Sequence, residues 1–467
     1  MLRIEQHAQL LLRDVGIEFR NDPVALELWR QAGASVNGVR VRMPEGLVTQ
    51  LCQTIPKQFV QYARNPSRSV MIGGSHTVFA PAYGSPFIRD LEKGRRYGTL
   101  EDFRNLVKLT YSIPWLHHSG GVVVEPCDIA VNKRHLDMIY AHIRYSDKPF
   151  LGMITAKDRA EDSVEMARIL FGAGYLEDHC CLMALVNANS PLMFDKVASE
   201  AMQVYASANQ AIMATPFILG GAMGPVTTAG ALAQALAEAL AAGAFTQIVR
   251  PGAPFVLGNF LSSMSMRSGS PTFGMPEPAM SSYVIGQLAR RQGIPLRCGG
   301  ALTAAKTCDA QAAYESADGL HSTVMGGANY VLHAAGWLEG GLVMGYEKLV
   351  LDADRLGAMH VLLEGFATDD NGLASGAHSE VGPGGHFMGC SHTMANYETA
   401  FFDAELSDSE SFEKWQENGS KDAETRAFER WKSLLERYEE PGIGQDINEA
   451  LQDFMDRKKA SSDDAWY

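Results

Sequence analysis

Apolar and polar positions follow two patterns along the middle of the chain. Short, almost wholly apolar runs start roughly 30 to 45 residues apart, the spacing of strand-helix-strand units. Seven such runs occupy residues 114–118, 150–154, 182–187, 211–219, 255–260, 295–300 and 329–333. Between most of them, apolar residues recur at helical spacing, in residues 159–171, 194–207, 229–242, 279–292 and 310–325.

Strands that alternate with helices at this period lie parallel and are joined by right-handed crossovers. Seven such units indicate an α/β fold and favour a closed (β/α)8 TIM-type barrel. An open, doubly wound sheet is the structural alternative. The eighth strand does not stand out, and we look for it in residues 358–388.

The segments that flank this region have different patterns. Helical spacing occurs in residues 6–15, 26–32 and 44–55, and residues 36–43 alternate around an Asn-Gly turn, which predicts a hairpin. Thr99 is placed to cap a helix in residues 97–111, with two acidic residues in its first turn. We expect an N-terminal helical and hairpin extension at 1–75, the barrel at 76–400 and charged C-terminal helices at 401–467.

The charge of the chain is concentrated at its end. Residues 401–467 hold 18 acidic and 9 basic side chains, so they supply -9 of the formal net charge of -14. Helical repeats at 423–438 and 446–458 predict helices that pack on the barrel or on a second subunit. We expect a homo-oligomer, a dimer or larger.

Composition narrows the classes of function. The negative charge disfavours a nucleic-acid partner, which would require a basic face. The most apolar stretch, 226–245, contains Gln234 and Glu238, so a buried helix explains it better than a membrane span. The first 13 residues carry charge throughout and lack the apolar core of a signal peptide. Seven scattered cysteines make a disulfide framework improbable, and we expect a cytoplasmic protein.

Polar residues at strand ends are the candidates for chemistry, because α/β sheets bind ligands beyond the carboxyl ends of their strands. His333 ends an apolar run and is followed by Trp337 and Glu339, while His386 follows two glycines that would let the backbone come close to a ligand. These positions predict three catalytic residues, His333, Glu339 and His386. His333 is expected to donate an N–H to the substrate, and Glu339 to orient it or balance a cationic charge.

The candidate binding residues combine aromatic rings with polar side chains near the same strand ends. They are Trp115, His117, His118, Phe217, Asn259, Arg297, Tyr330, Trp337 and His392. Rings around a pocket suit a quaternary ammonium group through cation–π attraction, and Arg297 suits a carboxylate.

Other cofactor classes have weaker support in the sequence. The glycine-rich loops lack a nucleotide-binding fingerprint in the right strand-turn-helix setting. His179, Cys180 and Cys181 suggest zinc, but adjacent ligands on a strand point in opposite directions. We expect no tightly bound metal.

Three separate motifs, in the same order, resemble the trimethylamine methyltransferase family. They are residues 269–317, the run GGANYVLHAAGWLEGG at 326–341 and the run VGPGGHFMGCSHTMANYETAFF at 381–402. The resemblance covers most of the chain. It implies a (β/α)8 barrel that demethylates a methylamine and passes the methyl group to cob(I)alamin on a separate corrinoid protein.

The chain departs from the founding members of that family, which carry pyrrolysine, because every residue here is standard. It is similar instead to the non-pyrrolysine branch, whose substrates are quaternary amines such as glycine betaine. We expect a quaternary-amine:corrinoid methyltransferase whose corrinoid partner docks over the barrel mouth near residues 264–280. The alternatives are a zinc-dependent methyltransferase or metal-dependent barrel lyase, and a non-catalytic betaine-binding protein.

Overall fold

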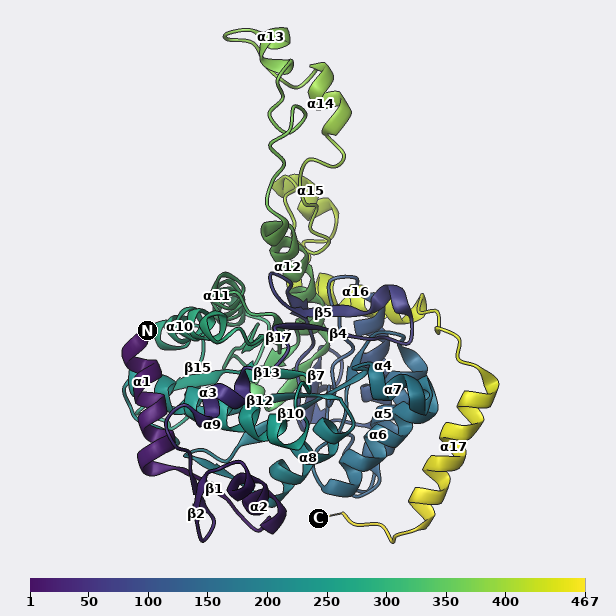
Figure 1. Ribbon diagram of the computed structural model, residues 1–467. Coiled ribbons are helices and arrows are strands. Elements are labelled where there is room, and N and C mark those ends of the chain that lie inside the picture. Colours follow the sequence, from purple (N-terminus) through teal and green to yellow (C-terminus); the bar gives the residue numbers. More distant parts are fainter. Residues whose placement is uncertain (467) are drawn as a thin grey trace.

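A parallel sheet forms the centre of the protein, as seen in a computed structural model that describes residues 1–466 (Figure 1). Its central strands are β6 (Val78–Phe79), β9 (Phe150–Leu151), β10 (Leu182–Ala188), β12 (Ala211–Leu219), β13 (Phe255–Gly258), β16 (Leu296–Gly299) and β17 (Tyr330–Leu332). Neighbours in the sheet run in the order β6, β17, β16, β13, β12, β10, β9, and every pair is parallel.

The outermost strands of this order, β6 and β9, both bond the segment 118–120. The backbone N–H of His118 donates to Phe79 O at 3.2 Å, and the N–H of Leu151 donates to Gly120 O at 2.8 Å. The prediction of a strand at 114–118 is wrong, because the chain only reaches the sheet at 118–120 and forms no regular strand there.

The prediction of a strand in residues 358–388 is wrong. These residues contain the end of α12 (Tyr346–Glu364) and helix α13 (Ala377–Val381). The remaining strand of the parallel sheet is β6, whose two residues are too few to stand out as an apolar run.

Helices follow the strands and cover the sheet. They are α5 (Arg134–Tyr145), α6 (Lys157–Phe171), α7 (Ala173–Asp178), α8 (Lys196–Ser207), α9 (Thr228–Val249), α10 (Pro276–Gln292), α11 (Ala310–Gly326) and α12. The five helices predicted from spacing correspond to α6, α8, α9, α10 and α11, and these predictions are confirmed. Local sequence sets several of the ends: Asp195 and Asp309 cap α8 and α11, and Gly293 ends α10 in a left-handed conformation.

Helix α9 is long and apolar enough to cross a membrane, with a mean hydropathy of 1.3. However, 89% of its apolar window is buried inside the fold, which identifies it as a core helix.

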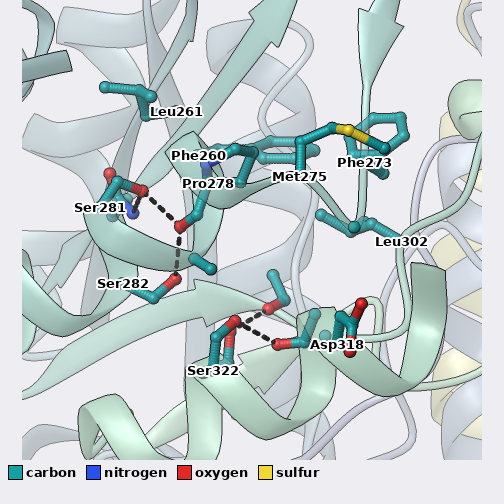
Figure 2. A pocket seen from close by; sticks show the side chains of 17 residues that line it. Phe260, Leu261, Phe273, Met275, Pro278, Ser281, Ser282, Leu302, Asp318 and Ser322 are labelled. Atoms are coloured by element: carbon teal, nitrogen blue, oxygen red, sulfur yellow. Dashed lines mark hydrogen bonds between the residues drawn. The ribbon is translucent and has the colours of Figure 1, made fainter. Parts of the chain in front are cut away.

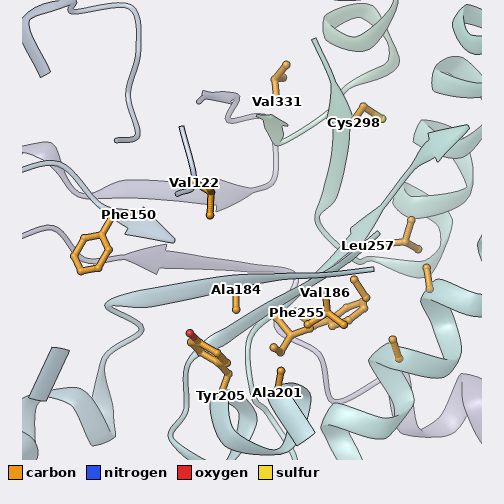
Figure 3. Close-up of a cluster of buried hydrophobic side chains, with 14 of the residues drawn as sticks. Val122, Phe150, Ala184, Val186, Ala201, Tyr205, Phe255, Leu257, Cys298 and Val331 are labelled. Atoms are coloured by element: carbon orange, nitrogen blue, oxygen red, sulfur yellow. The ribbon is translucent and has the colours of Figure 1, made fainter. Parts of the chain in front are cut away.

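The two faces of the sheet belong to different cores. On the outer face, Ala184, Val186, Phe255 and Leu257 pack with residues such as Tyr205 of α8 (Figure 3). The inner face forms a second, smaller core from residues that include Met183, Leu185, Met213, Val256 and Leu332. Because side chains alternate along a strand, one strand supplies both cores.

A hairpin lies against the amino ends of the parallel strands. It consists of β4 (Gln58–Gln61) and β5 (Val70–Gly73), separated by a 3-10 turn at Pro66–Arg68. Val70 and Ile72 join the inner core beside Val78, the first residue of β6. The inner core is therefore covered at this end of the sheet.

The N-terminal region packs on α9 and on the loop after β10. Its elements are α1 (Leu2–Leu10), a π-helix (Leu11–Val15), β1 (Ile17–Phe19), α2 (Pro23–Gln31), β2 (Ser35–Asn37), β3 (Arg40–Arg42) and α3 (Leu47–Cys52). The predicted hairpin is confirmed, since β2 and β3 pair antiparallel. Strand β1 also pairs with β11 (Met193–Phe194), and Phe19 packs against Phe245 of α9 at 5.2 Å between ring centroids.

Small sheets surround the carboxyl ends of the parallel strands. One contains β18 (Trp337–Leu338), β19 (Val343–Gly345), β7 (Phe87–Asp90) and β8 (Gly94–Tyr97), and a 3-10 turn at Glu339–Gly341 joins its first two strands. Strand β14 (Phe260–Met264) pairs with β12 and with β15 (Pro271–Thr272). Helix α4 (Leu100–Ser112) follows β8 and begins at the predicted cap, where Thr99 and Asp102 form a reciprocal capping box.

The charged C-terminal helices pack on their own chain, which confirms one of the two expected arrangements. They are α15 (Phe412–Glu417), α16 (Ala423–Glu436) and α17 (Gln445–Ala460). Trp431 of α16 stacks on Tyr346 of α12 at 4.6 Å, and Lys458 of α17 pairs with Asp162 of α6 at 2.6 Å. Between α12 and α15 the chain forms a long projection that carries α13 and α14 (Ser391–Asn396) (Figure 1).

Candidate active site

Arg297 lies within the parallel sheet, on β16, and points into a row of polar side chains. Its register partners are Gly258 on β13 and Tyr330 on β17. A Cβ atom at Gly258 would lie 2.0 Å from the Thr215 hydroxyl, so glycine leaves room for that hydroxyl beside Arg297. Neighbouring strands thus bring Thr215, Arg297 and Tyr330 together.

The guanidinium of Arg297 is completely buried and mostly unpaired. Its Nη1 donates to the carbonyl of Asn259 at 3.3 Å, while its Nε and Nη2 have no partner. The hydroxyls of Thr215 and Tyr330 are also buried without a partner. Burial lowers the pKa of Arg297 to about 10, so the group is a cation at neutral pH. This set of donors suits a carboxylate that binds both free nitrogens.

Aromatic rings form a cluster beside this guanidinium. The Phe260 ring lies 5.2 Å from the Arg297 Cζ, and its centroid is 5.1 Å from Phe217, 5.5 Å from His333 and 6.0 Å from Trp337. His333 and Trp337 meet edge to face at 4.3 Å. Such π-faces attract a cation that has little hydration of its own.

His333 is held neutral and in a fixed orientation. Its Nδ1 accepts the backbone N–H of Tyr83 at 3.2 Å, so a neutral ring carries its proton on Nε2. Burial, with a smaller contribution from the Arg297 charge, holds the pKa of His333 well below its usual range. The residue has a φ of 61°, a left-handed conformation that ends β17 and turns the chain.

A pocket of about 40 Å³ adjoins the aromatic cluster and is lined by Phe260 and by Phe273, whose ring lies 6.1 Å from Trp337 (Figure 2). Its walls come from β14, from the first turns of α10 and from α11. The Asn259 side chain faces this pocket; its Nδ2 donates to Ser281 at 3.3 Å, and its Oδ1 is buried without a partner. The volume is enough for a few water molecules.

Six of the predicted site residues therefore lie in one place: Phe217, Asn259, Arg297, Tyr330, His333 and Trp337. Asn259 differs from the prediction because its side chain faces away from Arg297, and its carbonyl makes the contact instead.

Two predicted binding residues lie at the other end of the sheet. His117 accepts the backbone N–H of Phe79 at 3.1 Å, and burial lowers its pKa to about 4. Trp115 packs between His360, at 5.5 Å, and Phe402, at 6.1 Å. Neither residue reaches the aromatic cluster, because 114–117 lies at the amino ends of the strands, where His117 lines a groove with Ser69 and Val78.

His118 and Glu339 have other partners than those expected. His118 contacts Gln61 at 3.2 Å, and its ring lies 5.2 Å from Tyr330 on the side toward the covering hairpin. Glu339 forms a two-pronged ion pair with Arg95 of β8, at 2.8 and 3.2 Å. The orientation of His333 comes from Tyr83 rather than from Glu339.

His386 and His392 lie on the projection between α12 and α15, away from the sheet (Figure 1). His392 contacts the carbonyl of Asn371 within that projection, at 2.8 Å. The structure of the single chain does not bring either histidine to Arg297.

Sequence reasoning missed two residues of the site. Thr215 was recognisable as the polar residue inside the apolar run 211–219, but nothing in the sequence showed that Gly258 would make room for it. Tyr83 follows β6, and it could have been found only by treating the short run 77–81 as a strand.

Within residues 1–466, no group of three or more His, Cys, Asp or Glu side chains is arranged to hold a metal ion. Cys180 and Cys181 are buried in different cores, and burial raises the pKa of Cys180 to about 12 and that of Cys181 still further. Thiols held in the protonated form are poor zinc ligands.

Comparison with known proteins identifies the family of this chain. The family model described as trimethylamine methyltransferase (MTTB) matches residues 1–463, so the chain belongs to that family. It is 39% identical to the glycine betaine methyltransferase of Desulfitobacterium hafniense, over 97% of this chain and 94% of that protein.

A more distant relative and a solved structure each match more than nine-tenths of the chain. The L-carnitine:corrinoid methyltransferase of Eubacterium limosum is 25% identical over 92% of this chain and 90% of its own. The crystal structure of the Methanosarcina barkeri monomethylamine methyltransferase has a TM-score of 0.53 and 11% identity, and covers 93% of this chain and 91% of its own. The mixed α/β fold is therefore shared with that enzyme.

Proposed function

We propose that the protein demethylates a quaternary amine that carries a carboxylate, with glycine betaine as the first choice, and transfers the methyl group to a Co(I) corrinoid on a partner protein. The observation that carries this proposal is the buried, half-unpaired guanidinium of Arg297 next to the aromatic cluster. A guanidinium for an anion lies 5.2 Å from an aromatic ring for a cation, and this pair suits a small molecule with an anionic and a cationic end. The 39% identity to a glycine betaine methyltransferase supports the same substrate.

In the proposed complex, the carboxylate binds Arg297 Nε and Nη2, with the hydroxyls of Thr215 and Tyr330 as further donors. The ammonium group lies among Phe217, Phe260 and Trp337. The neutral ring of His333 completes this wall without repelling the cation. The ammonium then faces the carboxyl ends of the strands, the side from which a partner can approach.

The chemistry makes few demands on acids or bases. A quaternary ammonium already carries a neutral leaving amine. Loss of one methyl group from glycine betaine therefore releases dimethylglycine without a proton transfer. The corrinoid, when bound, supplies the nucleophile that accepts the methyl group. The residues of this chain orient the methyl group and exclude water, which is where the rate enhancement arises.

The corrinoid protein is proposed to dock over the carboxyl ends of the strands, beside residues 264–280. Two apolar side chains on that rim are strongly exposed, Met266 at 77% and Val226 at 71%. Flexible methionines suit a surface that must receive a large planar group.

The parallel sheet is proposed to be a closed (β/α)8 barrel within residues 76–400. Residues 1–75 and 401–467 are proposed to be the N-terminal extension and the C-terminal helices of the chain. The strands occur around the sheet in chain order, and 118–120 bonds both β6 and β9. A doubly wound sheet would instead reverse its order at a switch point.

All seven cysteines are free thiols, which supports a reducing compartment, the cytoplasm.

The proposed activity is tested by incubating the protein with Co(I) cobalamin and a panel of amines while recording the spectrum of the methylated corrinoid. We expect methylation with glycine betaine and none with trimethylamine, which has no fourth carbon substituent on its nitrogen and therefore no carboxylate. Binding of glycine betaine without methylation, even after the cognate corrinoid protein is added, would indicate a binding protein. Activity that disappears with a metal chelator would indicate the zinc alternative.

A further inference from the structure

The projection between α12 and α15 is a folded arm rather than a loose loop. We call residues 365–401 the arm; it extends well beyond the rest of the protein (Figure 1). Its two sides are tied by hydrogen bonds from Asn371 to Asn396, at 3.0 Å, and from the Ser391 N–H to Glu380, at 2.9 Å. At its base, Phe402 packs on Trp115, so the arm returns to the point from which it left.

The arm presents large apolar side chains that nothing in the chain covers. Phe366 is 90% exposed, Phe401 87% and Met388 83%, and Leu373, Met394 and Tyr397 are also exposed. Between residues 366 and 401, only Ala377 and Cys390 are buried. So many exposed apolar side chains on one projection mark a contact with another molecule.

A groove of about 460 Å³ lies at the base of the same arm. It is bounded by the hairpin β4–β5, by the start of β6 and by the end of α12, where His360, Leu363 and Glu364 line it. The last turn of α12 adds an exposed apolar strip, Val361–Leu363, directly beside it. The groove therefore lies at the amino ends of the parallel strands, opposite the Arg297 site.

Charge favours contact between the arm and this groove. The arm contains four acidic residues, Asp369, Asp370, Glu380 and Glu398, and no lysine or arginine. The groove offers the half-exposed Arg68, which also pairs with Asp147 at 3.1 Å, and the exposed His76, with Glu364 as its acidic member. Lys148 lies deeper in the wall, where its Nζ donates to three backbone carbonyls.

We propose that the arm binds a second copy of this chain, with each arm lying against the groove at the base of the other. Because arm and groove adjoin, a two-fold axis between them brings both pairs together at once and covers every apolar surface described above. A corrinoid protein does not fit here, since it has to reach the carboxyl ends of the strands. The dimer leaves those ends free in both copies.

Sedimentation velocity at micromolar concentration tests this arrangement. The arm variant carries Phe366→Ser, Met388→Ser and Phe401→Ser. A matched control carries Val24→Ser, Tyr314→Ser and Met325→Ser, three exposed apolar residues on α2 and α11. We expect the wild type and the control to sediment as two copies or an even multiple, and the arm variant as half that number. A monomeric wild type, or an arm variant that assembles as the wild type does, would overturn the proposal.

A cross-link identifies the surface that the arm touches. Benzoylphenylalanine replaces Met388, and light and isotopically heavy copies are mixed before irradiation. We expect heavy–light cross-links to residues 67–78 or 360–364. Cross-links confined to one copy, or directed to the carboxyl-end face, would reject this mode of contact. Both readouts are independent of substrate, so they stand apart from the test of the proposed activity.

Discussion

At the scale of single residues, the proposed binding of a carboxylate depends on Arg297. An unpaired charge in the interior costs several kcal/mol, and no carboxylate within residues 1–466 forms an ion pair with this guanidinium. A protein that keeps such a group gains from it when an anionic ligand binds. A mutation of Arg297 should therefore weaken ligand binding without lowering the stability of the free protein.

Replacing Arg297 with methionine should weaken the binding of glycine betaine by about a hundredfold or more, since two charge-assisted hydrogen bonds worth about 1.5–3 kcal/mol each are lost. The melting temperature of the free protein should stay the same or rise, because a buried charge is removed. Calorimetric titration and thermal melting measure the two effects. Tetramethylammonium, which has no carboxylate, is the matched ligand, and its binding should change little. A large drop in melting temperature with unchanged betaine affinity would assign Arg297 a structural role.

His333 allows stability and binding to be separated with two variants. His333→Ala should destabilise the fold by about 2–4 kcal/mol, because alanine is strained at a φ of 61° and leaves the Tyr83 N–H without an acceptor. His333→Asn should recover most of this loss, since asparagine tolerates the left-handed region and offers an acceptor. Both variants should bind glycine betaine roughly five- to tenfold more weakly, as one wall of the aromatic cluster is gone. If both bind it normally, His333 is not part of the site.

Half of the residues predicted for the site lie together in the structure, and the other half lie elsewhere for a physical reason. His333 ends an apolar run and Arg297 lies inside one, and both reach the site because neighbouring parallel strands in register bring their side chains to one place. Trp115, His386 and His392 were chosen for their chemistry, and their distance in space depends on where the chain leaves the sheet. Glu339 stands close to His333 in sequence, but the turn at Glu339–Gly341 directs it to Arg95.

At the scale of elements, the segment 118–121 connects β6 to β9, and a buried histidine side chain holds this segment in place. His142 of α5 accepts the Ser119 hydroxyl at 2.7 Å and donates to the carbonyl of Gly121 at 2.7 Å. Burial lowers the pKa of His142 to about 4. The segment is therefore stable only while this ring stays neutral.

Stability should fall as the pH drops from about 6.5 toward 4. In that window the unfolded chain binds a proton on His142 and the folded chain does not, so each pH unit costs up to about 1.4 kcal/mol for this residue. Urea unfolding at pH 7, 6 and 5 measures the slope. His142→Gln, which keeps a donor and an acceptor, should flatten it by one histidine's share, whereas His321→Gln at an exposed position should not. An unchanged slope in His142→Gln would contradict the assignment.

The long helices, the hairpin β2–β3 and strand β9 followed from the sequence, whereas strand β6 and the segment 118–120 did not. Helices such as α9 and α11 have enough apolar positions to define a period, and their ends carry caps or glycines. Strands β6 and β9 have two residues each. The segment 118–120 connects these two strands through hydrogen bonds to residues far away in the sequence. Pattern alone could not show this, so the search for a missing strand moved to 358–388.

At the scale of the whole molecule, binding and assembly occupy opposite ends of the parallel strands. The Arg297 site and the Met266 rim lie at the carboxyl ends, and the arm and its groove at the amino ends. The two functions should therefore be separable. The arm variant with Phe366→Ser, Met388→Ser and Phe401→Ser should bind glycine betaine within about twofold of the wild type while its assembly is reduced. Calorimetric titration of the separated species measures this, and a much larger loss would mean that assembly shapes the site.

A crystal structure of the protein soaked with glycine betaine tests the central claim most directly. We expect the two carboxylate oxygens within about 2.7–3.2 Å of Nε and Nη2 of Arg297, and the trimethylammonium group among Phe217, Phe260 and Trp337 with one methyl group facing the carboxyl ends of the strands. A betaine bound elsewhere, or one with its carboxylate toward the partner side and its methyl groups against Arg297, would contradict this account of the site.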